Sequence, residues 1–315
     1  MCTSVAIRTE RFYFGRNMDI DYSFGERVAI APRNYSLSFR KTTAMDKHYA
    51  IIGMAAVAEN YPLYADGMNE NGLCMAGLKF TGNAVYSETI TAGKTGIAPY
   101  ELIPWILGRC RTVSEARTLL NETCIINEPF SAELPLSPLH WHIADKNSSI
   151  VVENTADGMK IYDNPADVLT NNPPFPFHLA NLSQYARLSP DFSPENSIAE
   201  PFGLGFGAIG LPGDFSPASR FARAEFLLRS MPSDSGISDF FHILDNTAIP
   251  RGAVITPDKK LHFTTYSCCM DTSEAVYFYK LYNGQTKGIA LSSPRINDNS
   301  LMEFTLSDNH TFLTE

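Results

Sequence analysis

Short runs of apolar residues, many alternating with polar ones, dominate the first ninety positions and indicate β-strands rather than helices. The runs are rich in β-branched and aromatic residues and are separated by Pro, Gly and polar residues, which is typical of short strands joined by turns. The strands expected in this part of the chain cover residues 3–8, 12–18, 28–31, 35–39 and 50–57. Further strands are expected at 139–144, 149–153, 159–162, 274–281 and 286–291, the last two joined by an Asn283-Gly284 turn.

Helical patterns occur mainly in the middle of the chain. The expected helices cover residues 98–109, 113–120, 175–187, 216–229 and 237–246. Thr112 and Glu115 have the spacing of a capping box, and Ser216 followed by Pro217 is typical of a helix start. Strands at both ends with helices between them favour an α+β fold of antiparallel sheets covered by helices over a regular βαβ alternation.

The composition is that of a soluble globular protein, with 44% apolar and 19% charged residues, and we expect one domain over residues 1–315. The net charge of -9 argues against a nucleic-acid-binding protein, because phosphate binding needs a basic surface. The chain has no run of eighteen apolar residues, so no membrane-spanning segment is expected.

The six cysteines favour reduced thiols. They show no repeated CxxC spacing, and Cys268 and Cys269 are adjacent, which is neither a disulfide framework nor a zinc pattern. The first residues also lack the charged and long apolar segments of a secretory signal. We therefore expect a cytoplasmic protein.

The first two expected strands would form a hairpin that gathers three reactive side chains. In such a hairpin Cys2 lies opposite Asn17 or Met18, with Arg16 at the diagonal position and Asp19 just beyond the pairing. The pattern leaves open which face of the hairpin each side chain occupies, because a slip of one residue inverts it.

Removal of Met1 would give an N-terminal cysteine that carries both a thiol and a free amine. Nucleophile and base would then belong to one residue, as in the N-terminal threonine variants of the catalytic triad. A nearby guanidinium favours the thiolate, and a carboxylate can orient the ammonium. Taken alone, a cysteine after the initiator methionine is more often only a small residue, so Cys2 by itself does not decide between these interpretations.

Several ordered motifs resemble the choloylglycine hydrolase family, which contains bile salt hydrolases and penicillin V acylases. They are Met1-Cys2-Thr3, Phe14-Gly15-Arg16-Asn17-Met18-Asp19, Tyr61-Pro62-Leu63-Tyr64-Ala65-Asp66-Gly67-Met68-Asn69-Glu70, Leu139-His140-Trp141, Val168-Leu169-Thr170-Asn171-Asn172-Pro173 and Gly210-Leu211-Pro212-Gly213-Asp214-Phe215-Ser216-Pro217-Ala218-Ser219-Arg220-Phe221. The resemblance covers essentially the whole chain. It implies an N-terminal-nucleophile hydrolase fold, a four-layer αββα sandwich of two antiparallel sheets.

The resemblance also implies the roles of individual residues. Cys2 would be the nucleophile and, through its amine, the base; Arg16 and Asp19 would lie beside it; Asn171 would donate to the oxyanion; and Arg220 would support the site. The family's apolar acyl pocket matches Met18, Ala65, Phe130 and Leu134. Read without the family, these four are ordinary core or loop residues.

One position departs from the family pattern. Bile salt hydrolases often have Asn in the segment that reads Gly77-Leu78-Lys79-Phe80 here, and penicillin acylases tend to have Tyr. A backbone N–H at Lys79 could still serve the oxyanion, whereas its side chain would change the polarity near the reacting carbonyl. Our hypothesis is that Lys79 alters substrate preference without abolishing hydrolysis.

The resemblance favours a bile salt hydrolase that acts on glycine- or taurine-conjugated bile salts without a cofactor. It also implies a homotetramer in which residues 188–210 reach a neighbouring subunit, although such a segment can equally be a surface loop. A penicillin V acylase or other N-acyl amidase is the first alternative. A non-enzymatic protein that binds steroids on the same scaffold is the second.

Three other patterns favour less specific interpretations. Gly205-x-Gly207-x-x-Gly210 matches a dinucleotide-binding motif, but no strand precedes it and Pro212 follows it, so we interpret it as a loop. The His140-x-His142 pair could face a metal, but without a recognisable partner it is interpreted as hydrogen-bonded strand histidines. The absence of a GxSxG motif disfavours an α/β-type serine hydrolase.

Overall fold

Two large antiparallel sheets face each other in the computed structural model, which describes residues 1–191, 206–291 and 294–307. The first sheet has the order β13-β1-β2-β15-β16-β17, with β14 paired to β15. Its strands are β1 (Cys2–Arg8), β2 (Phe12–Ile20), β13 (Val168–Leu169), β14 (Val254–Ile255), β15 (Leu261–Asp271), β16 (Val276–Leu281) and β17 (Lys287–Ala290).

The second sheet has the order β12-β11-β10-β7-β6-β4-β3-β18, with β5 paired to β4. Its strands are β3 (Arg27–Ala31), β4 (Ile51–Ala58), β5 (Tyr61–Tyr64), β6 (Asp66–Asn69), β7 (Cys74–Lys79), β10 (Leu139–Ala144), β11 (Ser149–Thr155), β12 (Gly158–Asp163) and β18 (Met302–Thr305). A small parallel pair, β8 (Thr95–Ile97) and β9 (Thr123–Ile125), lies apart from both sheets.

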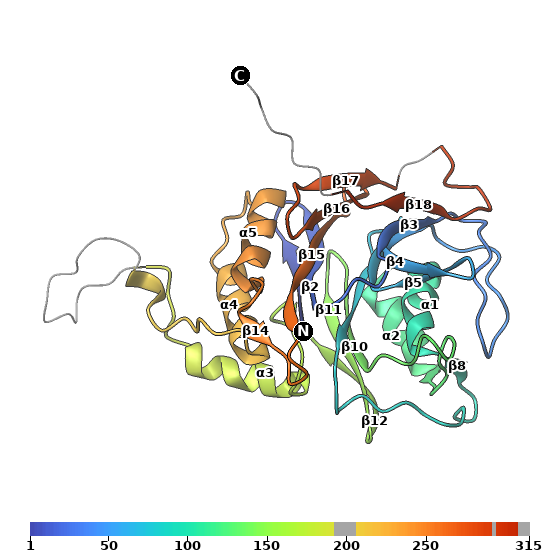
Figure 1. The fold of residues 1–315 in the computed structure, drawn as a ribbon, viewed down its shortest axis with the longest axis horizontal. Helices are drawn as coiled ribbons and strands as arrows, with labels where there is room; N and C mark the ends of the chain where they lie inside the picture. Colours follow the sequence, from blue (N-terminus) through green and yellow to red (C-terminus); the bar gives the residue numbers. More distant parts are fainter. Residues whose placement is uncertain (192–205, 292–293, 308–315) are drawn as a thin grey trace, which may run out of the picture.

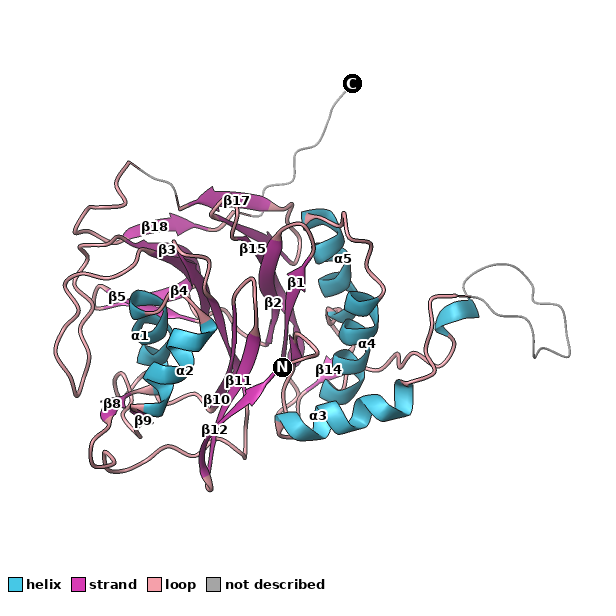
Figure 2. Cartoon of the chain, turned by 180° about the vertical axis from the view of Figure 1, so that it is seen from behind, coloured by secondary structure: helices cyan, strands magenta, loops and turns pink. Residues whose placement is uncertain are grey.

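Helices cover the outer face of each sheet (Figures 1 and 2). On the first sheet these are α3 (Phe175–Asn181), α4 (Pro217–Arg229) and α5 (Ile237–Thr247), of which α4 contacts β1 and α5 contacts β2 and β15. On the second sheet α1 (Leu102–Arg109) contacts β4, β6 and β7, and α2 (Val113–Asn121) lies beside it. The expected α+β sandwich with four αββα layers is confirmed.

Strand periodicity gives the first sheet two different faces. Residues of even number on β1 and β2 point toward the second sheet: Ser4 bonds to His142 on β10, and the Phe14 ring packs against the same histidine. Residues of odd number point toward the helices, because Tyr13 packs against Phe240 of α5. The position of a residue along β1 or β2 therefore determines whether its side chain faces the second sheet or the helices.

Most expected elements are present with small changes at their ends, and two predictions are wrong in part. Residues 35–39 form no strand; only Leu37 makes a single bridge, to Met45. Their apolar side chains pack as a loop instead, with the Phe39 ring against Trp105 of α1. The helix expected at 175–187 is α-helical only over Phe175–Asn181 and continues as a 3-10 turn over Leu182–Tyr185.

The sequence reasoning missed β15, an eleven-residue strand in the middle of the first sheet. Its polar residues hide the strand pattern because they serve buried hydrogen bonds rather than a solvated face. Thr264 donates to Asp19, and Ser267 donates to Asn17. The expected loop at 188–210 lies in large part outside the described residues.

Candidate active site

The pairing of β1 with β2 brings the sulfur of Cys2 and the guanidinium of Arg16 together. Cys2 pairs with Met18 and Ser4 pairs with Arg16, so Arg16 occupies the diagonal position that the sequence predicted. These side chains share the face that looks toward the second sheet, which settles the question that the pattern alone left open. Cys2 and Arg16 are almost fully buried there.

The Arg16 guanidinium connects the nucleophile to the second sheet. One of its nitrogens donates to Cys2 Sγ, and the other donates to the carbonyl oxygens of Ala65, at 3.2 Å, and Gly77. Burial alone would lower the pKa of Arg16, but the neighbouring Cys2 thiol and Tyr266 raise it, so the guanidinium keeps its charge. The positive charge of Arg16 therefore lies directly against the sulfur of Cys2.

A buried carboxyl group lies behind Arg16 and was not anticipated from the sequence. Asp66 on β6 accepts hydrogen bonds from Tyr266 (2.7 Å) and Tyr277 (2.6 Å) and is fully buried. Burial raises the pKa of Asp66, while the charge of Arg16 acts in the opposite direction. The only signal in the sequence was the motif around Asp66, because its two tyrosine partners lie about 200 residues away along the chain.

Asn171 and Arg220 fix the backbone of Cys2 from the chain segments next to β1. Asn171, just after β13, accepts the Cys2 backbone N–H at 2.8 Å and donates through Nδ2 to the carbonyl of Lys79 at 2.7 Å. Arg220 of α4 donates to the same amide oxygen at 2.8 Å, to the carbonyl of Cys2 and to Thr3 Oγ1 at 2.6 Å. Cys2 is therefore held on both sides of its own Cα.

Asp19 lies on the helix-facing side of β2, where Thr264 donates to its Oδ1 at 2.6 Å. Its Oδ2 is 3.8 Å from Nη1 of Arg220 and, among the residues described, has no hydrogen-bond partner although it is fully buried. A buried carboxylate oxygen without a donor is uncommon and needs an explanation.

Met1 precedes β1, and its backbone is hydrogen-bonded to that of Asp19. Its ammonium donates to the carbonyl of Asp19 at 2.7 Å and lies 3.0 Å from Nε2 of His262, while its own carbonyl accepts from the Asp19 N–H at 3.0 Å. Burial lowers the pKa of this amine, while the neighbouring Cys2 and Asp19 act in the opposite direction. His262 was not anticipated from the sequence.

Two of the four expected pocket residues lie next to the nucleophile. Met18 Sδ is 4.0 Å from Cys2 Sγ, and the Ala65 carbonyl binds Arg16. Phe130 instead packs between Tyr61 and Tyr100 on the side of the second sheet that α1 covers, and Leu134 is 41% exposed. Phe130 and Leu134 as pocket walls stay predictions.

The two strand histidines are confirmed as hydrogen-bonded core residues. His140 contacts Glu153 at 3.1 Å and the carbonyl of Thr170 at 3.0 Å. His142 lies between Ser4, at 2.8 Å, and Ser149, at 2.7 Å. Both rings are fully buried with both nitrogens occupied, so neither is free to bind a ligand. Gly205 of the glycine-rich motif lies outside the described residues.

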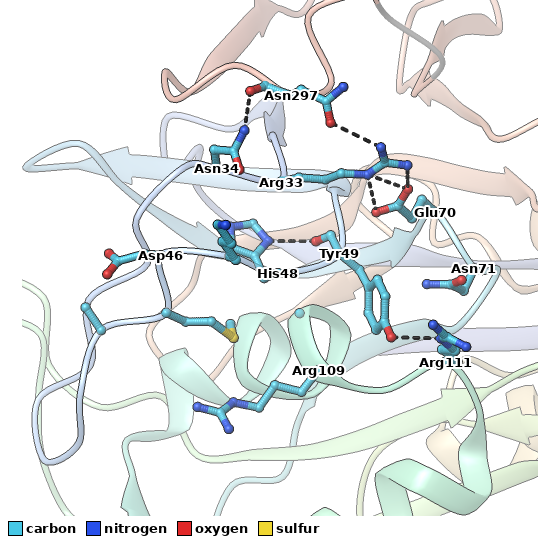
Figure 3. A pocket seen from close by; sticks show the side chains of 14 residues that line it. Arg33, Asn34, Asp46, His48, Tyr49, Glu70, Asn71, Arg109, Arg111 and Asn297 are labelled. Atoms are coloured by element: carbon cyan, nitrogen blue, oxygen red, sulfur yellow. Dashed lines mark hydrogen bonds and ion pairs between the residues drawn. The ribbon is translucent and has the colours of Figure 1, made fainter.

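A cavity of about 1010 Å³ lies elsewhere on the molecule and is not the candidate site (Figure 3). Its polar groups are largely bonded to one another: Arg33 pairs with Glu70, His48 contacts the carbonyl of Tyr49, and Arg111 donates to the Tyr49 hydroxyl. None of the candidate site residues, Cys2, Arg16, Asp19, Asn171 and Arg220, lines this cavity, so the cavity is separate from the candidate site.

Comparison with known proteins identifies related chains. The family model described as linear amide C-N hydrolases, choloylglycine hydrolase family, matches residues 2–304. A bile salt hydrolase/transferase from Lactiplantibacillus plantarum is 46% identical over 316 residues, covering 97% of each chain. A solved structure of a conjugated bile acid hydrolase variant from Clostridium perfringens has a TM-score of 0.93 at 36% identity and covers 99% of each chain.

The fold extends to a more distant relative. Penicillin V acylase from Agrobacterium tumefaciens has a TM-score of 0.77 at 21% identity, covering 96% of this chain and 90% of that one. At this level of identity the likeness concerns the architecture alone. In the described part of this chain, no helix is both long and apolar enough to cross a bilayer.

Proposed function

Because the chain belongs to the choloylglycine hydrolase family of linear amide C–N hydrolases, we propose that it cleaves the amide bond joining a cholic-type acid to glycine or taurine. The names of the Lactiplantibacillus and Clostridium relatives point to bile salts as substrates. The observation that carries the proposal is the contact of the charged Arg16 guanidinium with Cys2 Sγ, while Asn171 and Arg220 hold the backbone of the same residue.

The active form begins at Cys2, after an aminopeptidase has removed Met1. The nitrogen of Cys2 then changes from an amide into an amine that can carry additional protons, and Asn171 Oδ1 already accepts from this nitrogen at 2.8 Å. The buried Asp19 Oδ2, which has no donor among the described residues, would accept from the new ammonium. In this proposal, removal of Met1 supplies the hydrogen-bond donor that Asp19 Oδ2 lacks among the described residues.

The reaction begins when the Cys2 thiolate attacks the amide carbon and forms a tetrahedral intermediate. Its collapse breaks the C–N bond, the Cys2 ammonium gives a proton to the departing nitrogen, and a thioester remains. Water then attacks the thioester carbon, the amine of Cys2 takes a proton from it, and the thiolate leaves with the bile acid released. All proton transfers use groups of this chain, so the proposal requires no cofactor.

In this proposal Asn171 stabilises the oxyanion. Its Nδ2 uses one hydrogen for the carbonyl of Lys79, which fixes the amide and leaves the second hydrogen for the substrate oxygen. A donor fixed in this way is worth about 3–4 kcal/mol of the barrier in other acyl-transfer enzymes. In this proposal Cys2, Arg16 and Asp19 perform the chemistry, and Arg220 holds Cys2 and Asn171 in place.

Amine release from a panel of substrates tests the proposal. Purified protein is given glycine and taurine conjugates of cholic acid and penicillin V, and intact mass establishes whether Met1 is absent. We expect rapid release of glycine or taurine by wild type and loss of at least about a thousandfold in Cys2→Ser. Equally poor release by wild type and Cys2→Ser would favour a steroid-binding protein, and faster turnover of penicillin V would favour an acylase. Full activity in material that retains Met1 would refute the mechanism.

The proposal includes the assembly and location expected from the sequence: a single domain over residues 1–315, a homotetramer and a cytoplasmic protein. In support of one domain, β18 near the end of the chain pairs with β3 near its start. In support of a reducing compartment, all six cysteines are free and buried. Light scattering coupled to gel filtration tests the tetramer, and cell fractionation tests the location.

A further inference from the structure

Met1 occupies a space that becomes available once it is removed. The space is bounded by the backbone of Asp19, which bonds to Met1 through both its N–H and its carbonyl, and by the imidazole of His262 on β15. It adjoins the nitrogen of Cys2. On the side of the second sheet, Asn171 connects that nitrogen to the end of β7, because it bonds to Cys2 N–H and to the carbonyl of Lys79.

Lys79 is the last residue of β7, and its side chain is exposed. Two cations, Arg220 and Lys79, are near enough to the Met1 amine for their charges to lower the pKa of that amine, although burial is the larger cause. Arg220 is fully buried, and hydrogen bonds to Cys2, Thr3, Asn171 and Phe215 occupy its guanidinium. Within residues 1–191, 206–291 and 294–307, Lys79 has no carboxylate partner, so its ammonium is available to a ligand.

The chemistry determines where the departing amine must lie. The amine accepts its proton from the nitrogen of Cys2, so the two nitrogens must come within hydrogen-bond distance. The departing amine therefore lies next to the Cys2 nitrogen, and its substituents extend into the space that Met1 vacates. In an amino carboxylic or amino sulfonic acid, only one or two carbons separate the anionic group from the amine nitrogen. The flexible four-carbon side chain of Lys79 can reach this anionic group.

We propose that Lys79 pairs with an anionic group on the leaving amine, so that the site prefers amides of amino carboxylic and amino sulfonic acids to amides of uncharged amines. The inference rests on the hydrolase function proposed above and makes it more specific. It assigns recognition of the amine half of the substrate to Lys79 at the end of β7, whereas Met18 and Ala65 are the expected neighbours of the acyl half. The residue that departs from the family pattern then determines specificity.

The test compares two substrates that share one acyl group, cholic acid linked to glycine and cholic acid linked to ethanolamine. We expect Lys79→Gln to lower kcat/KM for the glycine conjugate roughly fivefold, mainly through KM, as is usual for the loss of one exposed ion pair. Its kcat/KM for the ethanolamide should stay within about twofold of wild type. Lys79→Arg should retain the preference for glycine, and added salt should narrow the difference between the two substrates in wild type.

Lys146→Gln is the matched control, because this exposed lysine follows β10 at the end of the sheet opposite to Lys79. It should behave as wild type on both substrates. An equal loss on both substrates in Lys79→Gln, or no loss on either, would overturn the inference while the hydrolase function stands. If wild type releases neither amine, the hydrolase function itself is wrong and Lys79 has no leaving group to bind.

Discussion

Asn171 combines two tasks in one amide group, since its oxygen holds Cys2 and Arg220 and its nitrogen is fixed by the carbonyl of Lys79. We expect Asn171→Ala to lower kcat for bile salt hydrolysis by about 10²–10³, because the tetrahedral intermediate loses a prepared donor. Steady-state amine release measures the effect. Asn172→Ala is the control, because Asn172 bonds to the carbonyl of Thr81 and to no residue of the site. Comparable losses in the two variants would show that Asn171 has no special role.

His142 makes the stability of the fold depend on pH. Burial lowers the pKa of His142 from 6.5 to about 3. The unfolded chain therefore binds a proton that the folded chain does not, so this contribution to stability is complete above pH 6.5 and is lost as the pH falls toward 3. Each unit of pH in that interval should remove about 1.4 kcal/mol from the free energy of unfolding.

Urea unfolding between pH 4 and 7 measures this contribution. The difference in free energy of unfolding between wild type and His142→Gln should shrink as the pH falls, because only wild type has the buried imidazole to protonate. His242→Gln, at an exposed position of α5, is the control and should follow wild type. Parallel curves for wild type and His142→Gln would mean that another group dominates acid unfolding.

Among the elements, β2 and β15 approach each other too closely for a side chain at Gly15. A Cβ there would lie 1.9 Å from the carbonyl oxygen of Cys268. We expect Gly15→Ala to lower the free energy of unfolding by about 3 kcal/mol or more, because backbone rather than a flexible side chain blocks the methyl group. Chemical denaturation measures it. Among the described residues, apart from its chain neighbours, no atom lies within 4 Å of a Cβ added at Gly213, so Gly213→Ala should change stability little. Similar effects of the two substitutions would contradict the close approach.

The same pair of strands shows how far the sequence could predict this protein. The hairpin of β1 and β2 is local, so turn and strand patterns were enough to place Cys2, Arg16 and Asp19 at the same end of the hairpin, but not to assign the face that each side chain occupies. Asn171 and Arg220 reach Cys2 from 169 and 218 residues away, and no local pattern encodes such contacts. Their place in the site was expected only because their motifs resemble a family. β15 was missed because its buried polar side chains do not alternate with apolar ones as an amphipathic strand requires.

At the scale of the whole molecule, the end of the chain protects an edge formed at its beginning. β18 pairs with β3, whose residues Val28–Ala31 are fully buried. A chain that ends at residue 300 lacks β18 and exposes the backbone groups of β3, and unpaired strand edges promote aggregation. We expect this truncation to accumulate as insoluble protein, whereas a chain that ends at residue 307 keeps every described strand and should stay soluble. Gel filtration of the two proteins checks this expectation. Equally monodisperse profiles for the chains that end at residues 300 and 307 would contradict it.

The bonded, half-buried position of Met1 has a consequence for timing in the cell. An aminopeptidase must bind the N-terminal residue in its own active site. In the folded protein, Met1 is already hydrogen-bonded to the backbone of Asp19. One of the contacts of Met1, His262 of β15, is synthesised 261 residues later. We therefore expect Met1 to be removed during synthesis on the ribosome, before the N-terminal segment has folded. A chain that keeps Met1 would fold with the nitrogen of Cys2 still in a peptide bond and without the free amine.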